Sequence, residues 1–193
     1  MLGLKLATDP RWVNIAEKTI EEILVDHAFC EQKAATSGIS LIVRFSNYPS
    51  IVEKVSPIVA EEWGHFRKVL KELKSRGFVL GKARKDTYVS ELQKFTMKGG
   101  SIETHIVEAL LVCAMIEARS CERFRLLSLH IQDEKLKDFY HEFMVSEAGH
   151  YRLFIELAEE FKTKEYVKER WTAFLEYEAE MMSKMEYRGD RVH

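Results

Sequence analysis

The sequence predicts an all-α protein. Apolar residues recur at steps of three and four along almost the whole chain, which is the period of an amphipathic helix, and the alternation typical of β-strands is scarce. Turn and capping signals divide this pattern into a small number of long segments. Three prolines and nine glycines among 193 residues leave little room for disorder, so we interpret residues 1–193 as a single folded domain.

The first two predicted helices are separated by one turn signal. Residues 9–10 (DP) pair a capping residue with a proline at the first helical position, which predicts the start of a long helix. Residues 47–50 (NYPS) predict a turn, after which a helix resumes either at Ser50 with a kink or afresh at residues 56–57 (SP). Gly77 is expected to end that second helix. The side chains expected on the inward stripe of the first helix, which continues through Arg44, are Ile15, Ile20, Leu24, His27, Glu31 and Ala35.

A long connection and three further helices follow. Residues 77–100 are irregular and basic, with one short helical stretch near residues 87–95. Residues 99–101 (GGS) supply a break and an N-cap for the third long helix, and residues 132–133 (QD) predict the turn before the fourth. A last helix is expected over residues 163–185. The side chains expected to face inward on the third and fourth helices are Ile106, Leu110, Cys113, Glu117, Cys121, Phe124, Leu136, Phe139, Phe143, Glu147, His150, Phe154 and Phe161.

Composition excludes several classes of protein. The N-terminal residues lack the basic start and apolar run of a signal peptide, and no segment is long and apolar enough to span a bilayer, so we expect a cytoplasmic location without a membrane partner. Three cysteines without a Cys-x-x-Cys argue against a disulfide framework, a structural zinc and a rubredoxin-type iron site. The net charge of -2 means that a polyanion would have to be held by a local patch.

Acids and histidines that are expected to face inward repeat in the four long helices. The order glutamate, then Glu-x-x-His, occurs twice, and its members are Glu31, Glu62, His65, Glu117, Glu147 and His150. In a helical hairpin, two residues meet at the same height only if the turn lies near their midpoint in sequence. The midpoint falls at residues 47–48 for the first set and near Asp133 for the second, where turns are independently predicted. At about 1.5 Å per residue each set lies roughly 24 Å from its turn, so we expect all six to converge at mid-bundle.

The chemistry of this set predicts a metal centre. Burying four carboxylates without a compensating cation costs several kcal/mol per ion. One glutamate from each of two helices and Glu-x-x-His from each of the other two is the ligand set of di-iron and di-manganese carboxylate bundles. Carboxylates with one imidazole per metal suit Fe or Mn and leave coordination positions open. A lone Glu-x-x-His is usually accidental, and only the joint pattern with both midpoint turns supports this interpretation.

Other residues are weaker candidates for a functional role. His27 lies one turn before Glu31 on the same face and is either a residue behind the ligands or an ordinary core histidine. Gly64 and Gly149 each precede a ligand histidine, which suggests either that space is needed there or simple tolerance. A phosphate-binding surface or merely a solvated face could be formed by the following cations: Arg119, Arg123, Arg125, Lys82, Arg84, Lys85, Lys94 and Lys98.

The chain resembles the bacterial tRNA hydroxylase family that acts on 2-methylthio-N6-isopentenyladenosine, a ferritin-like di-iron family. The similarity is carried through nearly the whole chain by TDPRW, DHAFCEQKAA, ISLIVRF, SPIVAEEWGHF, LKELKSRGF, RKDTYVSEL, IEARSCERF and SEAGHYRLFIELA. The most specific stretch is EARSCERF, which contains Glu117 and its arginines. The resemblance implies a ferritin-like four-helix bundle with a long crossover between helices two and three and an extra C-terminal helix.

The resemblance also implies an activity and its cofactors. The six ligand residues would hold two iron ions, with no catalytic residue beyond the ligands. From their positions in the sequence, Arg119, Arg123 and His27 are the candidates for contact with the substrate or for support of the ligands. The substrate would be the modified adenosine in the anticodon loop of tRNA, hydroxylated on a terminal methyl of its isopentenyl group. The reaction would use O2 and electrons from an external donor, because nothing in the chain resembles a flavin or nicotinamide fold.

Two rival functions are compatible with the residues alone. One is iron oxidation, storage or peroxide removal by a ferritin or rubrerythrin relative, although the Cys-x-x-Cys unit of the usual rubrerythrins is absent. The other is a helical interaction module whose core acids are accidental and which binds no metal. A monomer or small homo-oligomer is expected for the hydroxylase, whereas a cage is expected for a storage protein.

Overall fold

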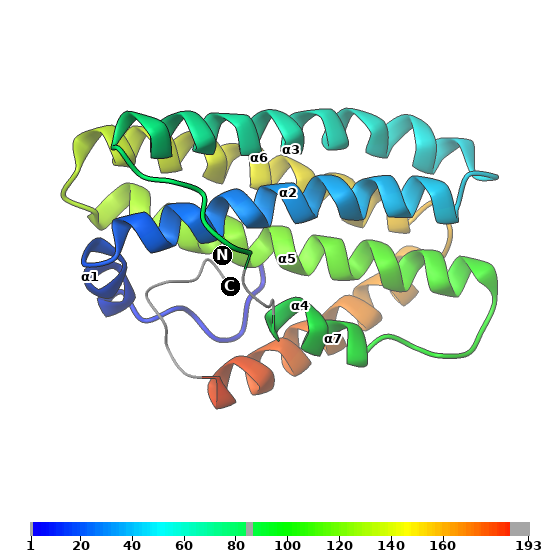
Figure 1. Cartoon of the computed structure of the whole chain (residues 1–193). Coiled ribbons are helices and arrows are strands. Elements are labelled where there is room, and N and C mark those ends of the chain that lie inside the picture. The colour runs from blue at the N-terminus through cyan, green and yellow to red at the C-terminus, as the bar shows by residue number, and fades with distance from the viewer. Residues whose placement is uncertain (1, 84–86, 186–193) are drawn as a thin grey trace. The chain divides into compact units, whose positions relative to one another are not determined.

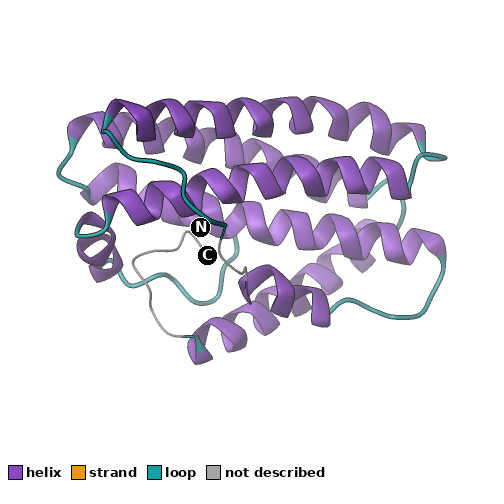
Figure 2. Cartoon of the chain, in the orientation of Figure 1, coloured by secondary structure: helices purple, strands orange, loops and turns teal. Residues whose placement is uncertain are grey.

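The computed structural model describes residues 2–83 and 87–185, and its described part contains helices and no strand (Figure 2). The helices are α1 (Arg11–Glu17), α2 (Ile20–Arg44), α3 (Pro49–Ser75), α4 (Thr87–Lys94), α5 (Ile102–His130), α6 (Glu134–Ala158) and α7 (Lys164–Lys184). The described residues divide into two compact units, residues 11–83 and residues 2–10 with 87–185. The single-domain interpretation stays a prediction. Arg84 and Lys85 of the basic connection lie outside the described residues.

The first unit is built on the hairpin of α2 and α3, which lie side by side (Figure 1). The predicted turn is confirmed, because α2 ends at Arg44 and α3 begins at Pro49, whose missing N–H is not needed at a helix start. The second helix therefore starts earlier than either alternative and continues through Pro57. At the other end Gly77, with φ +76°, allows the amide of Phe78 to donate to the carbonyl of Leu73 at 3.0 Å. This closes the helix with a Schellman motif.

The first predicted helix is two helices, which corrects the sequence expectation. The chain turns at residues 18–19, where Thr19 Oγ1 donates back to the carbonyls of Ile15 and Ala16, and α1 runs across the direction of α2 (Figure 1). Because α1 then buries Trp12 and its neighbours, Ile15 is 43% exposed instead of facing inward. A side-chain hydrogen bond to a preceding carbonyl competes with helix continuation, and no glycine or proline marks this break.

The second unit is built on the hairpin of α5 and α6, with α7 and α4 packed against α5. The starts of α5, α6 and α7 each have a side-chain cap: Ser101 Oγ accepts from Thr104, Asp133 Oδ1 from Leu136, and Thr163 Oγ1 from Tyr166. Helix α5 is buried on nearly every side, whereas the other long helices have a solvent face. Phe161 follows the end of α6 at Ala158 and is only half-buried, so it is not part of that inward stripe.

The connection before α5 is held down by Arg170 of α7. Its Nε and Nη2 donate to Glu108 Oε1 and Oε2 at 2.6 and 2.8 Å, and Nη2 also donates to the carbonyl of Phe95 at 2.8 Å. The guanidinium lies over the Phe95 ring, 4.3 Å from its centroid, and Phe95 stacks on Tyr177 at 4.3 Å. The short helix predicted near residues 87–95 is thereby confirmed as α4 and fixed on the second unit.

Candidate functional site

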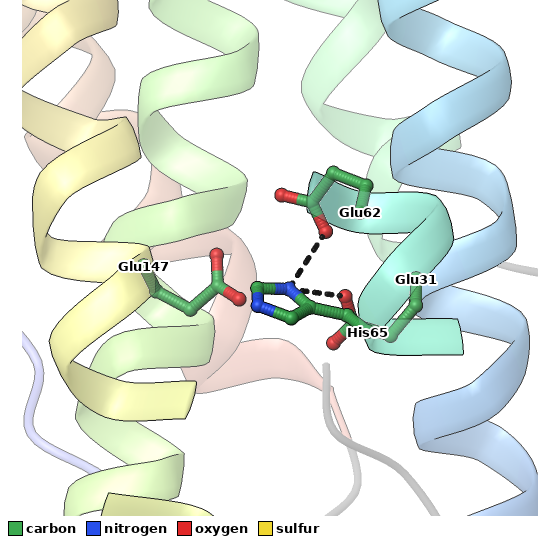
Figure 3. A group of neighbouring side chains, drawn as sticks. All are labelled: Glu31, Glu62, His65 and Glu147. Atoms are coloured by element: carbon green, nitrogen blue, oxygen red, sulfur yellow. Dashed lines mark hydrogen bonds and ion pairs between the residues drawn. The ribbon is translucent and has the colours of Figure 1, made fainter. Parts of the chain in front are cut away.

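The first hairpin brings together the three ligand candidates that the sequence assigned to it. One ligand atom each from Glu31, Glu62 and His65 lies within 4.8 Å of the others. His65 Nδ1 lies 3.4 Å from Glu31 Oε2 and 3.4 Å from Glu62 Oε2, and Figure 3 shows the ring directed between the two carboxylates. Both glutamates are buried, and the histidine is partly exposed. The midpoint argument therefore predicted correctly which side chains meet across this turn.

His27 contacts the other oxygen of the Glu31 carboxylate from the one that faces His65. Its Nε2 is 2.7 Å from Glu31 Oε1, and its side chain is completely buried. A carboxylate can only accept, so the proton of this contact resides on Nε2 of the imidazole. This hydrogen bond fixes the orientation of Glu31 and leaves its Oε2 directed toward His65.

The second hairpin repeats the arrangement with α5 and α6. One ligand atom each from Glu117, Glu147 and His150 lies within 4.8 Å of the others, and all three residues are buried. His150 Nδ1 lies 3.5 Å from Glu147 Oε2. As in the first hairpin, the imidazole presents Nδ1 to the carboxylate three residues earlier on its own helix, which i, i+3 spacing allows.

The donor sets fit a hard divalent metal. Each hairpin supplies two carboxylates and one imidazole, which are the oxygen and nitrogen ligands that iron and manganese accept. Two buried carboxylates close together repel each other, and a cation between them removes this repulsion. The residues present are therefore compatible with one metal ligand group in each hairpin.

Cys121, one turn after Glu117 on α5, is a buried thiol next to this second group. Its Sγ donates to the carbonyl of Met144 at 3.4 Å. Burial, together with the negative charge of Glu147, raises the pKa of Cys121 to about 11. The residue is therefore a neutral thiol at neutral pH and unsuited to be a nucleophile or a thiolate ligand.

The structure corrects the expected role of Arg119 and Arg123 as surface cations. Arg119 is 1% exposed, and its Nε and Nη2 donate to Glu178 Oε1 and Oε2, each at 2.8 Å. Nη1 donates to Glu122 and to Thr8, so the guanidinium is surrounded by protein acceptors. Arg123 is 3% exposed, and burial, with the nearby charge of Arg119, lowers its pKa to about 10. Neither arginine can form part of a phosphate-binding surface.

This buried network was missed in the sequence. Glu178 lies on α7 and Glu122 on α5, and neither belongs to a recognisable motif. Burial alone would lower the pKa of Arg119. The neighbouring carboxylate of Glu178 nevertheless holds this pKa above its ordinary value. The amide and hydroxyl of Thr8 both donate to Glu122, at 2.8 and 2.7 Å, so the network also ties down the N-terminal segment. Recognising this network from the sequence would require knowing that α5 is buried on nearly every side.

The matched glycines before the ligand histidines do not relieve crowding within the chain. A Cβ added at Gly64 or Gly149 would meet no atom within 4 Å among the described residues. Gly38 is the opposite case, since a Cβ there would lie 2.6 Å from Val59 Cγ2. The close approach of α2 and α3 therefore depends on Gly38, which the sequence interpretation did not single out.

Comparison with known proteins gives the class and then the family. A solved structure, "Protein 43 with aldehyde deformylating oxygenase activity from Synechococcus", matches with a TM-score of 0.92 and 33% identity, over 98% of this chain and 94% of that one. Together with the helix order, this match confirms that the chain is an all-α protein of the ferritin-like class.

The part of the chain that the structure describes contains no helix long and apolar enough to cross a membrane.

The family follows from sequence similarity. The model of the tRNA-(MS2IO6A)-hydroxylase (MiaE) family matches residues 2–193, and the chain belongs to this family. A tRNA 2-(methylsulfanyl)-N(6)-isopentenyladenosine(37) hydroxylase from Pseudomonas putida is 36% identical over 80% of this chain and 74% of its own length. The hydroxylase of the same name from Salmonella typhimurium is 29% identical over 68% of this chain. The match covers 47% of that relative, so this chain spans about half of its length. The resemblance expected from the sequence motifs is confirmed.

Proposed function

We propose that this chain is a di-iron monooxygenase that hydroxylates the isopentenyl group of 2-methylthio-N6-isopentenyladenosine in the anticodon loop of tRNA. One observation carries the proposal: in a member of the tRNA-(MS2IO6A)-hydroxylase family, each hairpin places a glutamate beside a Glu-x-x-His pair, with ligand atoms within 4.8 Å. Family membership supports the substrate, and the two ligand groups support the cofactor.

The six candidate ligands would together hold the iron. Those of the first hairpin are Glu31, Glu62 and His65, and those of the second are Glu117, Glu147 and His150. Two bound iron ions would supply the redox chemistry that lets O2 replace a C–H bond by a C–OH bond. Four carboxylates balance the charge of two divalent ions. This removes the desolvation penalty of burying the carboxylates or the cations without a partner.

The chain's own residues orient these ligands and protect the site. His27 donates from Nε2 to Glu31 Oε1, which holds that carboxylate in one rotamer and leaves Oε2 for a metal. Support of this kind behind a ligand raises metal affinity and fixes ligand direction. Because all four glutamates are almost fully buried, bulk water is kept away from the groups that would meet the apolar isopentenyl chain.

The overall reaction requires an outside source of electrons. Converting the terminal methyl to a hydroxymethyl group with one molecule of O2 consumes two electrons and two protons and releases one water. We propose that an external electron-transfer system delivers these electrons to the enzyme.

The target base in an exposed anticodon loop would be recognised as an unstacked nucleotide and not as part of a duplex. A cytoplasmic monomer or small homo-oligomer fits this task.

Mass spectrometry of tRNA nucleosides tests the activity. Prenylated, thiomethylated tRNA is incubated with iron-loaded protein, reductant and O2, and we expect a modified adenosine heavier by one oxygen. Glu117→Ala should abolish this product, whereas Glu156→Ala, which changes an exposed glutamate of α6, should leave it unchanged. A protein verified to contain iron that forms no such product would overturn the substrate assignment. Consumption of Fe(II) or peroxide without tRNA would then favour the iron-oxidation or peroxide-removal alternative.

A further inference from the structure

An exposed row of one aromatic and three cationic side chains runs along the solvent face of α3, the helix that carries Glu62 and His65. We call Trp63, Arg67, Lys71 and Lys74 the α3 stripe. Their spacings of four, four and three residues place them on one face of the helix. All four are exposed, and they lie on a different face of α3 from the buried Glu62 and Phe66.

The cations of the α3 stripe are uncompensated. Within the described residues, Arg67, Lys71 and Lys74 form no ion pair. The nearby buried acid of α3, Glu72, is engaged by Arg76, whose Nε lies 2.6 Å from Glu72 Oε1. Positive charge on the exposed face of this helix segment is therefore available to an outside anion, although the whole chain carries a formal charge of -2.

Trp63 is an aromatic ring held at the surface. It is 48% exposed, and its ring centroid lies 5.0 Å from that of Phe66, which is buried. The adjacent Gly64 is exposed and would have no neighbour within 4 Å of an added Cβ, so the backbone beside the ring is bare. An exposed tryptophan next to bare backbone leaves room for a flat group to lie against it.

We propose that the α3 stripe binds the single-stranded RNA loop that carries the target adenosine. Trp63 stacks on an unpaired base, and Arg67, Lys71 and Lys74 contact the phosphates. An aromatic ring beside a row of cations is the combination that binds single-stranded nucleic acid, because every base has a stacking face and every nucleotide a negative charge. The inference rests on the proposed function, which makes an unpaired tRNA loop the substrate of this chain.

An acidic electron-transfer protein is the main rival occupant of this surface. It would use the same cations, but it would have no need of a stacking ring beside bare backbone. The surface also differs from the basic connection considered in the sequence, where Lys94 is neutralised by Glu91 at 2.6 Å. The α3 stripe thus combines the cations and the stacking ring that fit an RNA loop.

Binding of a labelled RNA tests the proposal independently of turnover. The iron-loaded chain is titrated with a fluorescent anticodon stem–loop at several salt concentrations, and a fully paired RNA duplex of equal length serves as comparison. The charge-reversal variant is Arg67→Glu with Lys71→Glu. Its matched control, Lys18→Glu with Lys168→Glu, makes the same charge change at exposed lysines elsewhere. Trp63→Ala and Trp63→Phe separate stacking from charge, and iron content and helicity verify that each variant is folded.

The expected results differ between the two kinds of interaction. The charge reversal weakens stem–loop binding by roughly tenfold or more, and the dependence of log K on log salt becomes shallower by about 0.7 for each phosphate that the variant no longer binds. Trp63→Ala weakens binding by roughly five- to one-hundredfold without changing the salt dependence, and Trp63→Phe restores most of it. The duplex should bind more weakly and be insensitive to Trp63.

Three outcomes would overturn the proposal. One is stem–loop binding by the charge-reversal variant that equals binding by its matched control, and another is no loss with Trp63→Ala. The third is unchanged RNA binding together with slower reduction by a small acidic iron–sulfur protein, which would assign the surface to the electron donor. Failure of the wild type to hydroxylate tRNA is a separate result: it would refute the proposed function even if the variants lost RNA binding as expected.

Discussion

Arg119 shows at the residue scale how burial changes the meaning of a charged side chain. In sequence it is one of three arginines close to Glu117, a position that suggests contact with a phosphate. In the structure its guanidinium is bound by Glu178, Glu122 and Thr8, and it connects α5, α7 and the N-terminal segment. Its function is therefore to fix the position of α5, the helix that carries Glu117.

Removing this cation should be strongly destabilising. Arg119→Leu leaves the carboxylate of Glu178 buried without its partner, and we expect the free energy of unfolding to fall by about 3–5 kcal/mol. Arg119→Lys keeps the charge but loses the two-nitrogen contact and should cost less. Urea denaturation measures both, with the exposed Arg125→Leu as control, expected within about 0.5 kcal/mol of wild type. Equal stability of Arg119→Leu and the control would contradict the described network.

Tyr88 predicts a dependence of stability on alkaline pH. Burial, followed by the negative charge of Glu178, raises its pKa well above the ordinary value, and its hydroxyl donates to Glu178 Oε1 at 3.2 Å. The folded chain therefore keeps a proton that the unfolded chain loses above about pH 10, so stability falls as pH rises past that value, by up to about 1.4 kcal/mol per pH unit. Urea midpoints between roughly pH 9 and 11 should decline less steeply in Tyr88→Phe. Parallel curves for the two proteins would refute this assignment.

At the scale of the helices, three glycines that look alike in sequence should respond differently to alanine. Gly64→Ala and Gly149→Ala add a methyl group where no neighbour lies within 4 Å, so each should stabilise the fold by up to about 1 kcal/mol through helix propensity. Gly38→Ala places its Cβ 2.6 Å from Val59 Cγ2, and overpacking of about 1–3 kcal/mol should exceed that gain. Thermal denaturation of the three variants gives the order directly. A stabilised Gly38→Ala would show that α2 and α3 pack less closely than described.

What could be predicted from sequence follows the range of the forces involved. Helix starts at Ser101, Asp133 and Thr163 were predictable, because a cap is a contact with a residue three positions away. The proximity of the candidate ligands within each hairpin was predictable from the midpoint of a turn. The break at residues 18–19 was not, because no glycine or proline marks it. The burial of Arg119 was not either, because it depends on Glu178, which is 59 residues distant.

At the scale of the whole molecule, two units contribute to one proposed function. Each unit supplies a hairpin with one glutamate and one Glu-x-x-His pair, and each pair of carboxylates is buried. If the ligand groups hold iron, metal binding stabilises the folded chain relative to the unfolded chain. A ligand present at about 100 times its dissociation constant adds about 2.7 kcal/mol to stability. Iron loading should therefore raise the unfolding temperature of the wild type and have little effect on Glu62→Ala.

The number of iron ions bound per chain tests the central claim most directly. After anaerobic loading with Fe(II) and removal of unbound metal, we predict about two ions per wild-type chain. His65→Ala in the first hairpin and His150→Ala in the second should each lose iron, whereas His141→Ala, at an exposed position of α6, should retain about two. A wild-type chain that binds no iron, or histidine variants that both keep the full amount, would contradict the proposed di-iron centre.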